Sequence, residues 1–279
     1  MSRLYQTLTA QDGLPIFYIS SVPEAPQGIV VICHGYGGHS GQYEHFTAEL
    51  LAKGYGVYAY DHRGQGRSPA ERGHLDHFTD LVDDLDIVIN HVILTHPGIP
   101  IFTLGHSMGG LVSFLYGIQH PDLLHGQIFS APAVGKPWGT QVIPDWLWQI
   151  IGKHFAHIKI YPFIKRTSCS DPDFMRALRE DPLVLKMSTT GLFCEFIHHG
   201  VTLAQSQAIE YHLPCLFLHG KSDKIIPYRS SVEIFAQIPA LDKTLKLYDH
   251  LYHELLQEPE KALVIADILE WLDHRTDII

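Results

Sequence analysis

Short apolar runs alternate with longer amphipathic segments along most of the chain. Helical periodicity is clearest over residues 80–96, where Leu81, Leu85, Val88 and Val92 share one face. Apolar runs joined by such helices are typical of an α/β fold, in which helices cover both faces of a mostly parallel sheet. The runs that we assign to strands cover residues 28–33, 56–60, 101–104, 128–130, 215–218 and 244–248.

Both ends of the chain extend this pattern. Residues 4–9 and 15–20 flank an Asp12–Gly13 turn, which predicts an antiparallel hairpin. Residues 258–274 are expected to form a closing helix, because their apolar positions recur along one side.

The alternation stops between residues 133 and 212. This stretch has a mostly helical pattern, holds three of the four tryptophans and shows no clear strand. We therefore expect one α/β core, made of residues 1–132 and 213–279. A helical cap, residues 133–212, is expected as an insertion between two strands of its sheet.

A helix is expected near the start of this cap, with Pro144 in its first turn. Its apolar positions form a stripe that is flanked by Trp146 and Trp148. Such a stripe suits a lid that lines an acyl-chain tunnel or rests on a membrane interface. Packing against the core explains it equally well. The stripe consists of Leu147, Ile150, Ile151 and Phe155.

Composition and charge exclude several classes of protein. Of the 279 residues, 46% are hydrophobic, which is enough for a large core, and the formal net charge is −10. A nucleic-acid partner is not expected, because no basic face is visible. The start of the chain lacks a signal-type apolar stretch, and no run approaches the ~20 apolar residues of a membrane span. We expect a cytoplasmic protein, with peripheral membrane contact left open and the oligomeric state undetermined.

The sequence GHSMG at residues 105–109 fits the G-x-S-x-G pattern of a nucleophilic serine. The pattern is short and common, but here it follows a predicted strand and precedes a predicted helix over residues 111–119. That setting is the strand–turn–helix context which the motif requires. Ser107 is therefore the candidate nucleophile.

A serine nucleophile needs a histidine base, and the base needs an acid to orient it. In this type of fold the chain order is serine, acid, histidine. Asp223 and His253 fit this order, because each follows a predicted strand at its carboxyl end. Asp249 and His250 are rivals on the same loop as His253.

The intermediate of acyl transfer also needs two N–H donors for its oxyanion. We expect them to be the backbone amides of Met108, which follows the nucleophile, and Tyr36, in the glycine-rich loop HGYGG at residues 34–38. Nucleotide binding by this loop is disfavoured, because it has neither a following Lys-Ser/Thr pair nor a G-x-G-x-x-G pattern.

Together these motifs resemble the monoacylglycerol lipase and lysophospholipase group of α/β-hydrolases. The resemblance implies the same triad, Ser107, Asp223 and His253, and the same oxyanion donors, Tyr36 and Met108. The chain departs from the family where Gly38 and Gln65 stand, since members often carry an acidic residue and a histidine there. The matching stretches are HGYGGHSGQY (34–43), DHRGQGRS (61–68), GHSMGG (105–110), SAP (130–132), DPL (181–183), HGKSDK (219–224), DKTLKLY (242–248) and YHEL (252–255).

The expected function is hydrolysis of a small lipid ester, a monoacylglycerol or a lysophospholipid, without a metal or organic cofactor. A peptidase or thioesterase with the same triad remains open, as does a non-catalytic lipid-binding protein. A zinc enzyme is disfavoured, because no H-E-x-x-H occurs and His198–His199 lacks a familiar ligand partner. A peptidase would need a polar cap site for the substrate amine, for which Asp171, Asp173, Glu180 and Asp181 are candidates.

Overall fold

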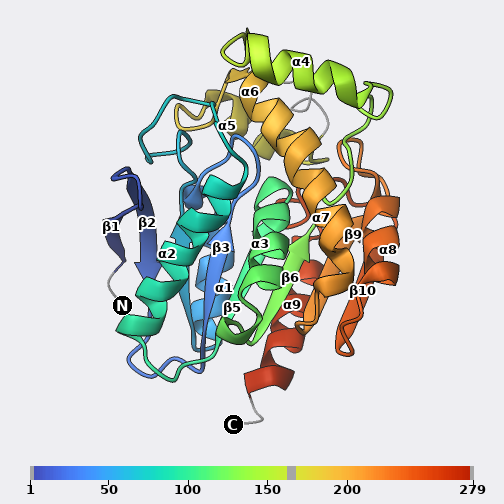
Figure 1. Cartoon of the computed structure of the whole chain (residues 1–279). Helices are drawn as coiled ribbons and strands as arrows, with labels where there is room; N and C mark the ends of the chain where they lie inside the picture. The colour runs from blue at the N-terminus through green and yellow to red at the C-terminus, as the bar shows by residue number, and fades with distance from the viewer. Residues whose placement is uncertain (1–2, 162–167, 277–279) are drawn as a thin grey trace.

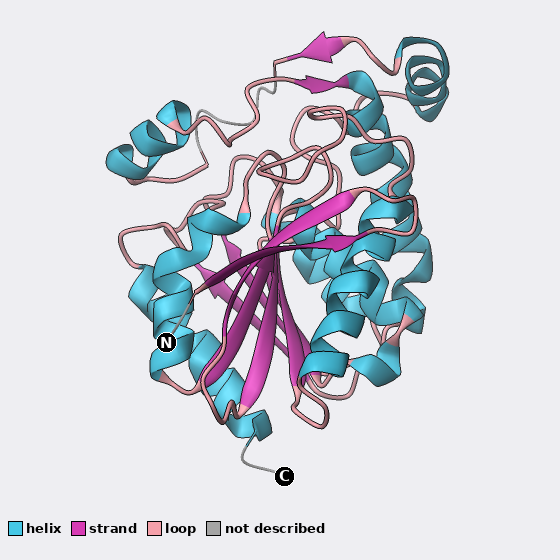
Figure 2. Cartoon of the chain, turned by 90° about the vertical axis from the view of Figure 1, so that its left-hand side faces the viewer, coloured by secondary structure: helices cyan, strands magenta, loops and turns pink. Residues whose placement is uncertain are grey.

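An eight-stranded sheet runs through the centre of the protein (Figures 1 and 2). The computed structural model describes residues 3–161 and 168–276. Six adjacent strands are parallel, and β2 joins them antiparallel to β4, with β1 antiparallel to β2 at the edge. The order across the sheet is β1 (Leu4–Thr9), β2 (Pro15–Ser21), β4 (Tyr55–Tyr60), β3 (Gly28–Cys33), β5 (Ile101–His106), β6 (Gly126–Ser130), β9 (Cys215–Gly220) and β10 (Lys243–Tyr248).

Helices cover both faces of this sheet (Figure 2), as the sequence pattern predicted. Strand β3 shows why its whole sequence is apolar. Ile29 and Val31 belong to the core on one face, whereas Val30 and Ile32 belong to the core on the other. The helices around the sheet are α1 (Glu44–Ala52), α2 (Thr79–Thr95), α3 (Met108–Gln119), α8 (Tyr228–Gln237) and α9 (Lys261–Thr276).

The sequence pattern did not predict α1 and α8, and their burial explains why. Helix α1 buries only Phe46 and Leu50 among its described side chains. Helix α8 buries Ser230 and Ser231 together with Ile234. Too few apolar positions recur in either helix for the 3.6-residue period to stand out.

The chain between β6 and β9, which are neighbours in the sheet, is mostly helical. Residues 162–167 of this stretch lie outside the described residues. The expectation of no strand is wrong, because two-residue strands β7 (Lys159–Ile160) and β8 (Ser188–Thr189) pair antiparallel. Such short strands carry too little pattern to predict. The helical elements are α4 (Asp145–Phe155), α5 (Pro172–Glu180), α6 (Thr190–Phe193), the π-helix η4 (Cys194–Gly200) and α7 (Val201–Gln207).

Helix α4 lies at the top of the molecule in Figure 1, beyond the central sheet. Pro144 precedes it as the N-cap rather than standing in its first turn. Its buried residue is Trp148, whereas the side chains of Ile150 and Phe155 from the predicted stripe are exposed. The helical period predicted which residues of α4 share a face, but it did not predict which face packs against the rest of the protein. No described helix is both long and apolar enough to cross a bilayer.

Candidate active site

Ser107 occupies the sharp turn between β5 and α3. Its backbone has φ 51° and ψ −116°, which is an unusual conformation for a residue with a side chain. Glycines on either side make the turn possible. A Cβ on Gly105 would lie 2.5 Å from the Gly109 carbonyl oxygen, and one on Gly109 would lie 2.2 Å from the Cys33 carbonyl oxygen. The turn thus holds the serine at the carboxyl end of a central strand.

Asp223 and His253 come together from the loops that follow β9 and β10. His253 Nδ1 lies 2.7 Å from Asp223 Oδ2, and because a carboxylate only accepts, the imidazole is the donor. The other carboxylate oxygen, Oδ1, accepts the backbone N–H groups of Ile225 and Ile226 at 2.7 and 3.0 Å. The acid is therefore fixed in place, and His253 Nε2 remains available to accept a proton.

Charge attraction overrides burial in this pair. Burial by itself would raise the pKa of the Asp223 carboxyl, but the neighbouring His253 and His219 hold it well below its usual value. Burial would likewise lower the pKa of His253, but the Asp223 carboxylate raises it above 6.5. Each partner therefore favours the charged form of the other.

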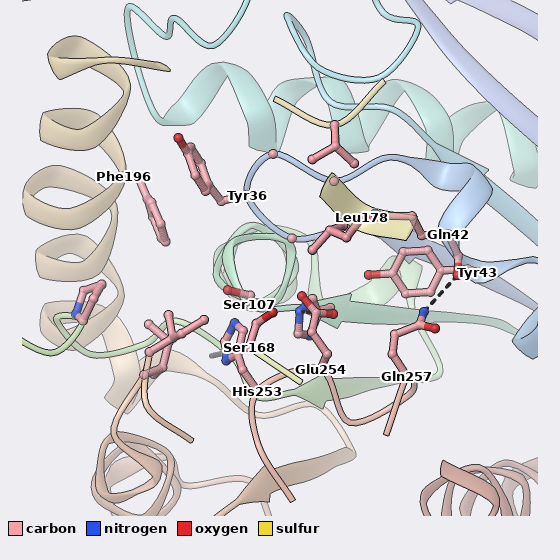
Figure 3. Close-up of a pocket in the computed structure, with 18 residues that line it drawn as sticks. Tyr36, Gln42, Tyr43, Ser107, Ser168, Leu178, Phe196, His253, Glu254 and Gln257 are labelled. Atoms are coloured by element: carbon pink, nitrogen blue, oxygen red, sulfur yellow. Dashed lines mark hydrogen bonds and ion pairs between the residues drawn. The ribbon is translucent and has the colours of Figure 1, made fainter. Parts of the chain in front are cut away.

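Ser107 and His253 lie side by side at one pocket (Figure 3), and both are among its lining residues. The rival residues on the same loop are excluded by their exposure. Asp249 is paired with Lys221 at 2.6 Å on the surface, and His250 is exposed. Of the predicted alternatives, the structure brings Ser107, Asp223 and His253 together.

His219 is a site residue that the sequence did not single out. Its Nε2 lies 3.0 Å from Asp223 Oδ2, and its Nδ1 lies 2.8 Å from Ser231 Oγ. The side chain is completely buried. Its place at the end of an apolar strand, four residues before Asp223, was the only sequence signal available.

A second carboxylate, Glu254, also lines the pocket. Its Oε2 lies 3.2 Å from His106 Nε2, and the rings of His106 and His253 are 4.9 Å apart between centroids. Burial would raise the pKa of Glu254, but His106 and His253 lower it below its usual value. The sequence placed Glu254 next to His253 without showing that it lies at the same pocket as Ser107.

The loop at residues 34–38 runs beside the elbow. Gly35 is required there, because a Cβ would lie 2.8 Å from His106 Cδ2. Within the described part of the chain, the backbone N–H groups of Tyr36 and Met108 donate no hydrogen bond. Two free amides next to Ser107 are the arrangement that an oxyanion would need.

The two departures from the family pattern both shape this loop. Gln65 Oε1 accepts the N–H of Gly37 at 2.7 Å. A Cβ on Gly38 would lie 2.6 Å from Gln42 Oε1. That oxygen accepts the N–H of His39 at 3.2 Å. The loop is therefore held by two glutamines.

The pocket is lined by both apolar and polar side chains. Figure 3 shows Tyr36 and Phe196 on one side of Ser107, and Gln42, Tyr43 and Gln257 on the other. Gln257 Nε2 donates to the Gln42 carbonyl oxygen at 2.9 Å. The segment between β6 and β9 supplies part of the lining. The aliphatic and phenylalanine side chains of the whole lining are Pro137, Leu178, Val184, Phe196, Ile225 and Ile226.

Comparison with known sequences adds a family to this geometry. The profile of the serine aminopeptidase S33 family matches residues 24–260. A monoacylglycerol lipase from Mycolicibacterium smegmatis is 34% identical over 273 residues, which cover 97% of each chain. Human monoglyceride lipase is 26% identical over 254 residues, which cover 90% of this chain and 84% of its own.

Solved structures show the same architecture. The crystal structure of a monoacylglycerol lipase from Paleococcus ferrophilus has a TM-score of 0.84 at 29% identity, covering 93% of this chain and 99% of its own. A thermostable carboxyl esterase from Bacillus coagulans has a TM-score of 0.86 at 19% identity, covering 99% of both chains, and shows the shared fold alone. These likenesses confirm the predicted α/β-hydrolase fold.

Proposed function

This chain belongs to the serine aminopeptidase S33 family, among the monoacylglycerol lipases of the α/β-hydrolases, and we propose that it hydrolyses the ester bond of a monoacylglycerol. The observation that carries the proposal is the buried Asp223–His253 hydrogen bond beside Ser107, at a pocket lined in part by apolar side chains. A nucleophile, a base and an orienting acid are the set that ester hydrolysis by an acyl-enzyme requires.

In the first half of the reaction, His253 Nε2 removes the proton of the Ser107 hydroxyl as Oγ attacks the ester carbonyl carbon. The N–H groups of Tyr36 and Met108 stabilise the resulting oxyanion, and loss of one such donor typically costs ~3 kcal/mol of transition-state stabilisation. The intermediate then collapses. The bond between the carbonyl carbon and the glycerol oxygen breaks, and His253 delivers its proton to that oxygen.

In the second half, water replaces glycerol. His253 takes a proton from the water molecule while the water oxygen attacks the acyl carbon. The bond to Ser107 Oγ breaks, His253 returns the proton to the serine, and the fatty acid leaves. Asp223 stabilises the imidazolium in both halves without taking up a proton.

The mixture of apolar and polar side chains in the pocket suits a neutral headgroup with a single acyl chain. Leu178, Val184 and Phe196 suit the acyl chain, whereas Gln42 and Gln257 offer amide groups to glycerol hydroxyls. The Glu254 carboxylate lines the same pocket and would repel the phosphate of a lysophospholipid. A monoacylglycerol is therefore favoured over a lysophospholipid.

We also propose that α4 touches the lipid surface from which the substrate is drawn. Trp146 is 61% exposed and Phe155 49% exposed, although both are large apolar side chains. Trp138, Val142 and Ile150 extend this exposed set. Because the net charge of −10 gives no general attraction to anionic lipids, apolar insertion would have to provide the binding.

Vesicle flotation tests the membrane contact. Zwitterionic vesicles should carry the wild type but not the triple variant Trp146→Ser, Ile150→Ser, Phe155→Ser. Hydrolysis of a soluble short-chain ester should remain unchanged in the variant, since these side chains do not line the pocket among its described residues. Equal flotation of both proteins contradicts the contact.

A serine-reactive phosphonate tests the chemistry. The wild type should be labelled and lose activity, and Ser107→Ala should take up no label. Ser168→Ala is the matched control, because Ser168 lines the same pocket but donates its hydroxyl to Met175 Sδ at 3.3 Å. Equal labelling of wild type and Ser107→Ala would contradict the assignment and favour a non-catalytic lipid-binding protein.

A substrate panel separates the remaining activities. Monoacylglycerol should be hydrolysed much faster than lysophosphatidylcholine, an acyl thioester or an aminoacyl amide. The peptidase alternative is weakened because Asp171 caps α5 by accepting the N–H of Asp173 at 2.8 Å, and Asp181 pairs with His39 at 2.8 Å. Preference for the amide would overturn the ester assignment and leave the triad intact.

A further inference from the structure

Three potential metal ligands from distant parts of the chain meet outside the active-site pocket. Glu71 and His74 lie in the connection between β4 and α2, and His157 lies between α4 and β7. One ligand atom from each lies within 4.8 Å of the others. His157 Nδ1 is 3.2 Å from Glu71 Oε2, and the rings of His74 and His157 stack with centroids 4.3 Å apart.

One ring nitrogen of His74 is held by Thr189, and the other faces a carboxylate. Its Nδ1 lies 2.8 Å from Thr189 Oγ1, and the Thr189 hydroxyl donates to the Gly73 carbonyl oxygen at 3.2 Å. With the Thr189 hydroxyl donating to Gly73, its oxygen accepts from His74 Nδ1–H, and the lone pair of a neutral His74 is then on Nε2. An imidazole whose second nitrogen is held in this way is typical of metal-binding histidines.

The available nitrogens face carboxylates rather than donors. His74 Nε2 lies 3.3 Å from Asp76 Oδ1, and His157 Nδ1 faces Glu71. Both nitrogens thus lie opposite carboxylate oxygens, where either ring N–H groups or one shared cation can stand between the imidazoles and the carboxylates. A single divalent ion would satisfy both histidines and offset both carboxylates.

We propose that Glu71, His74 and His157 bind one divalent transition-metal ion, with Zn²⁺ the best match. Two imidazoles and a carboxylate are ligands that Zn²⁺ commonly takes in proteins, and Asp76 or water would complete the four. Mg²⁺ and Ca²⁺ are disfavoured because they prefer oxygen ligands.

The pocket around His74 is specific to that side chain. A Cβ on Gly191 would lie 2.8 Å from His74 Cε1. Gly73 has φ +68°, and a Cβ there would lie 2.8 Å from the Met187 carbonyl oxygen. Gly191 thus makes room for the buried His74, and Gly73 lets the chain before His74 pass close to Met187. Glu71 and His157 are exposed, so that an ion can enter from solvent.

The ion would tie the end of α4 to the core. His157 stands two residues after Phe155, the last residue of α4, and the N–H of Gly191 bonds to the Ala156 carbonyl oxygen at 2.7 Å. His74 is hydrogen-bonded to Thr189, which stands two residues before Gly191. A metal there would link this connection to the loop after β4 and limit the movement of α4.

Zinc titration of the metal-free protein by calorimetry, with metal analysis after dialysis, tests the site. The wild type should bind one Zn²⁺, and His157→Asn should weaken this binding by at least about tenfold, as the loss of even outer-shell groups does. His154→Asn is the matched control, since His154 is an exposed histidine near the end of α4 outside the cluster. It should bind like the wild type.

Two further readouts separate a built site from surface binding. Zn²⁺, but not Mg²⁺, should raise the thermal midpoint of the wild type and His154→Asn, and should raise that of His157→Asn less at the same concentration. X-ray absorption should show two imidazole nitrogens on the zinc. The proposal is overturned if the wild type takes up no zinc, or if weak binding at several of the 20 histidines persists unchanged in His157→Asn.

Discussion

His219 and His253 donate hydrogen bonds to the same oxygen of Asp223. Their distances to Oδ2 are 3.0 and 2.7 Å, and the backbone N–H groups of Ile225 and Ile226 occupy the other oxygen. Four donors therefore hold one buried carboxylate. This fixes the direction in which Asp223 presents its charge to His253.

We predict that His219→Phe lowers kcat without changing KM. The variant removes one hydrogen bond to a charged group, for which a loss of ~1.5 kcal/mol, or about tenfold in rate, is expected. KM should be unaffected because His219 is absent from the described lining of the pocket. His219→Gln, which keeps a side-chain N–H donor, should recover part of the rate.

Steady-state kinetics on a soluble ester measures this split. If His219→Gln is as slow as His219→Phe, or if KM rises in step with the loss of kcat, His219 does not act by positioning Asp223.

Activity should fall as the medium becomes acidic, with a midpoint above pH 6.5. Burial lowers the pKa of His253, but the Asp223 carboxylate outweighs it and raises that pKa above 6.5. His253 must be neutral to accept the serine proton, so kcat/KM is lost as pH falls through this raised pKa. A pH profile of kcat/KM on a soluble ester gives the midpoint.

The matched variant for this pH dependence is Asp223→Asn. It removes the charge that raises the pKa of His253, so the midpoint should move to lower pH while kcat drops by about 10⁴-fold. An unchanged midpoint in Asp223→Asn would mean that another group controls the profile.

Gly109→Ala should destabilise the protein, whereas Gly152→Ala should not. A Cβ on Gly109 would lie 2.2 Å from the Cys33 carbonyl oxygen, in rigid backbone, and such overpacking costs about 2 kcal/mol or more in the free energy of unfolding. At Gly152, in α4, a Cβ would meet Cys194 Cβ at an ordinary 3.5 Å. Alanine there should stabilise the helix by roughly 0.5 kcal/mol.

Denaturant unfolding of both glycine variants measures the difference. Equal free energies of unfolding would mean that the backbone around Ser107 yields easily, and that the elbow is less tightly packed than the distances indicate.

Asp84→Ala should lower the free energy of unfolding by about 3 kcal/mol, because it breaks a buried ion pair with Arg63. This value is at the low end for such a pair, since Arg63 keeps other partners. Asp84 accepts two hydrogen bonds from Arg63, from Nε at 2.7 Å and from Nη2 at 2.6 Å, and its side chain is 1% exposed. Asp12 still contacts Arg63 at 2.9 Å.

The exposed neighbour Asp83 supplies the control for this pair. Asp83→Ala should change the free energy of unfolding by less than about 0.5 kcal/mol. Thermal and urea unfolding give both values, and a small effect of Asp84→Ala would show that the Arg63 contacts are not energetically coupled to folding.

The sequence by itself determined the sheet and the turn that holds Ser107. A continuous apolar run such as β3 is buried on both faces, so its composition alone indicates a central strand. The turn at Ser107 lies in one strand–turn–helix unit, within which a Cβ on Gly105 would meet the Gly109 carbonyl oxygen. Both features depend on local periodicity and neighbours in the chain, which the order of residues contains directly.

Tertiary structure alone decided which side of α4 is buried, which acid faces His253, and that His219 supports that acid. It also decided that Glu71 and His74 meet His157. These contacts join loops that are far apart in the chain, and their distances depend on how helices and strands pack rather than on any local period. The chain order favoured Asp223 and left Asp249 as a rival, and the fold then placed Asp223 beside the imidazole and Asp249 in solvent.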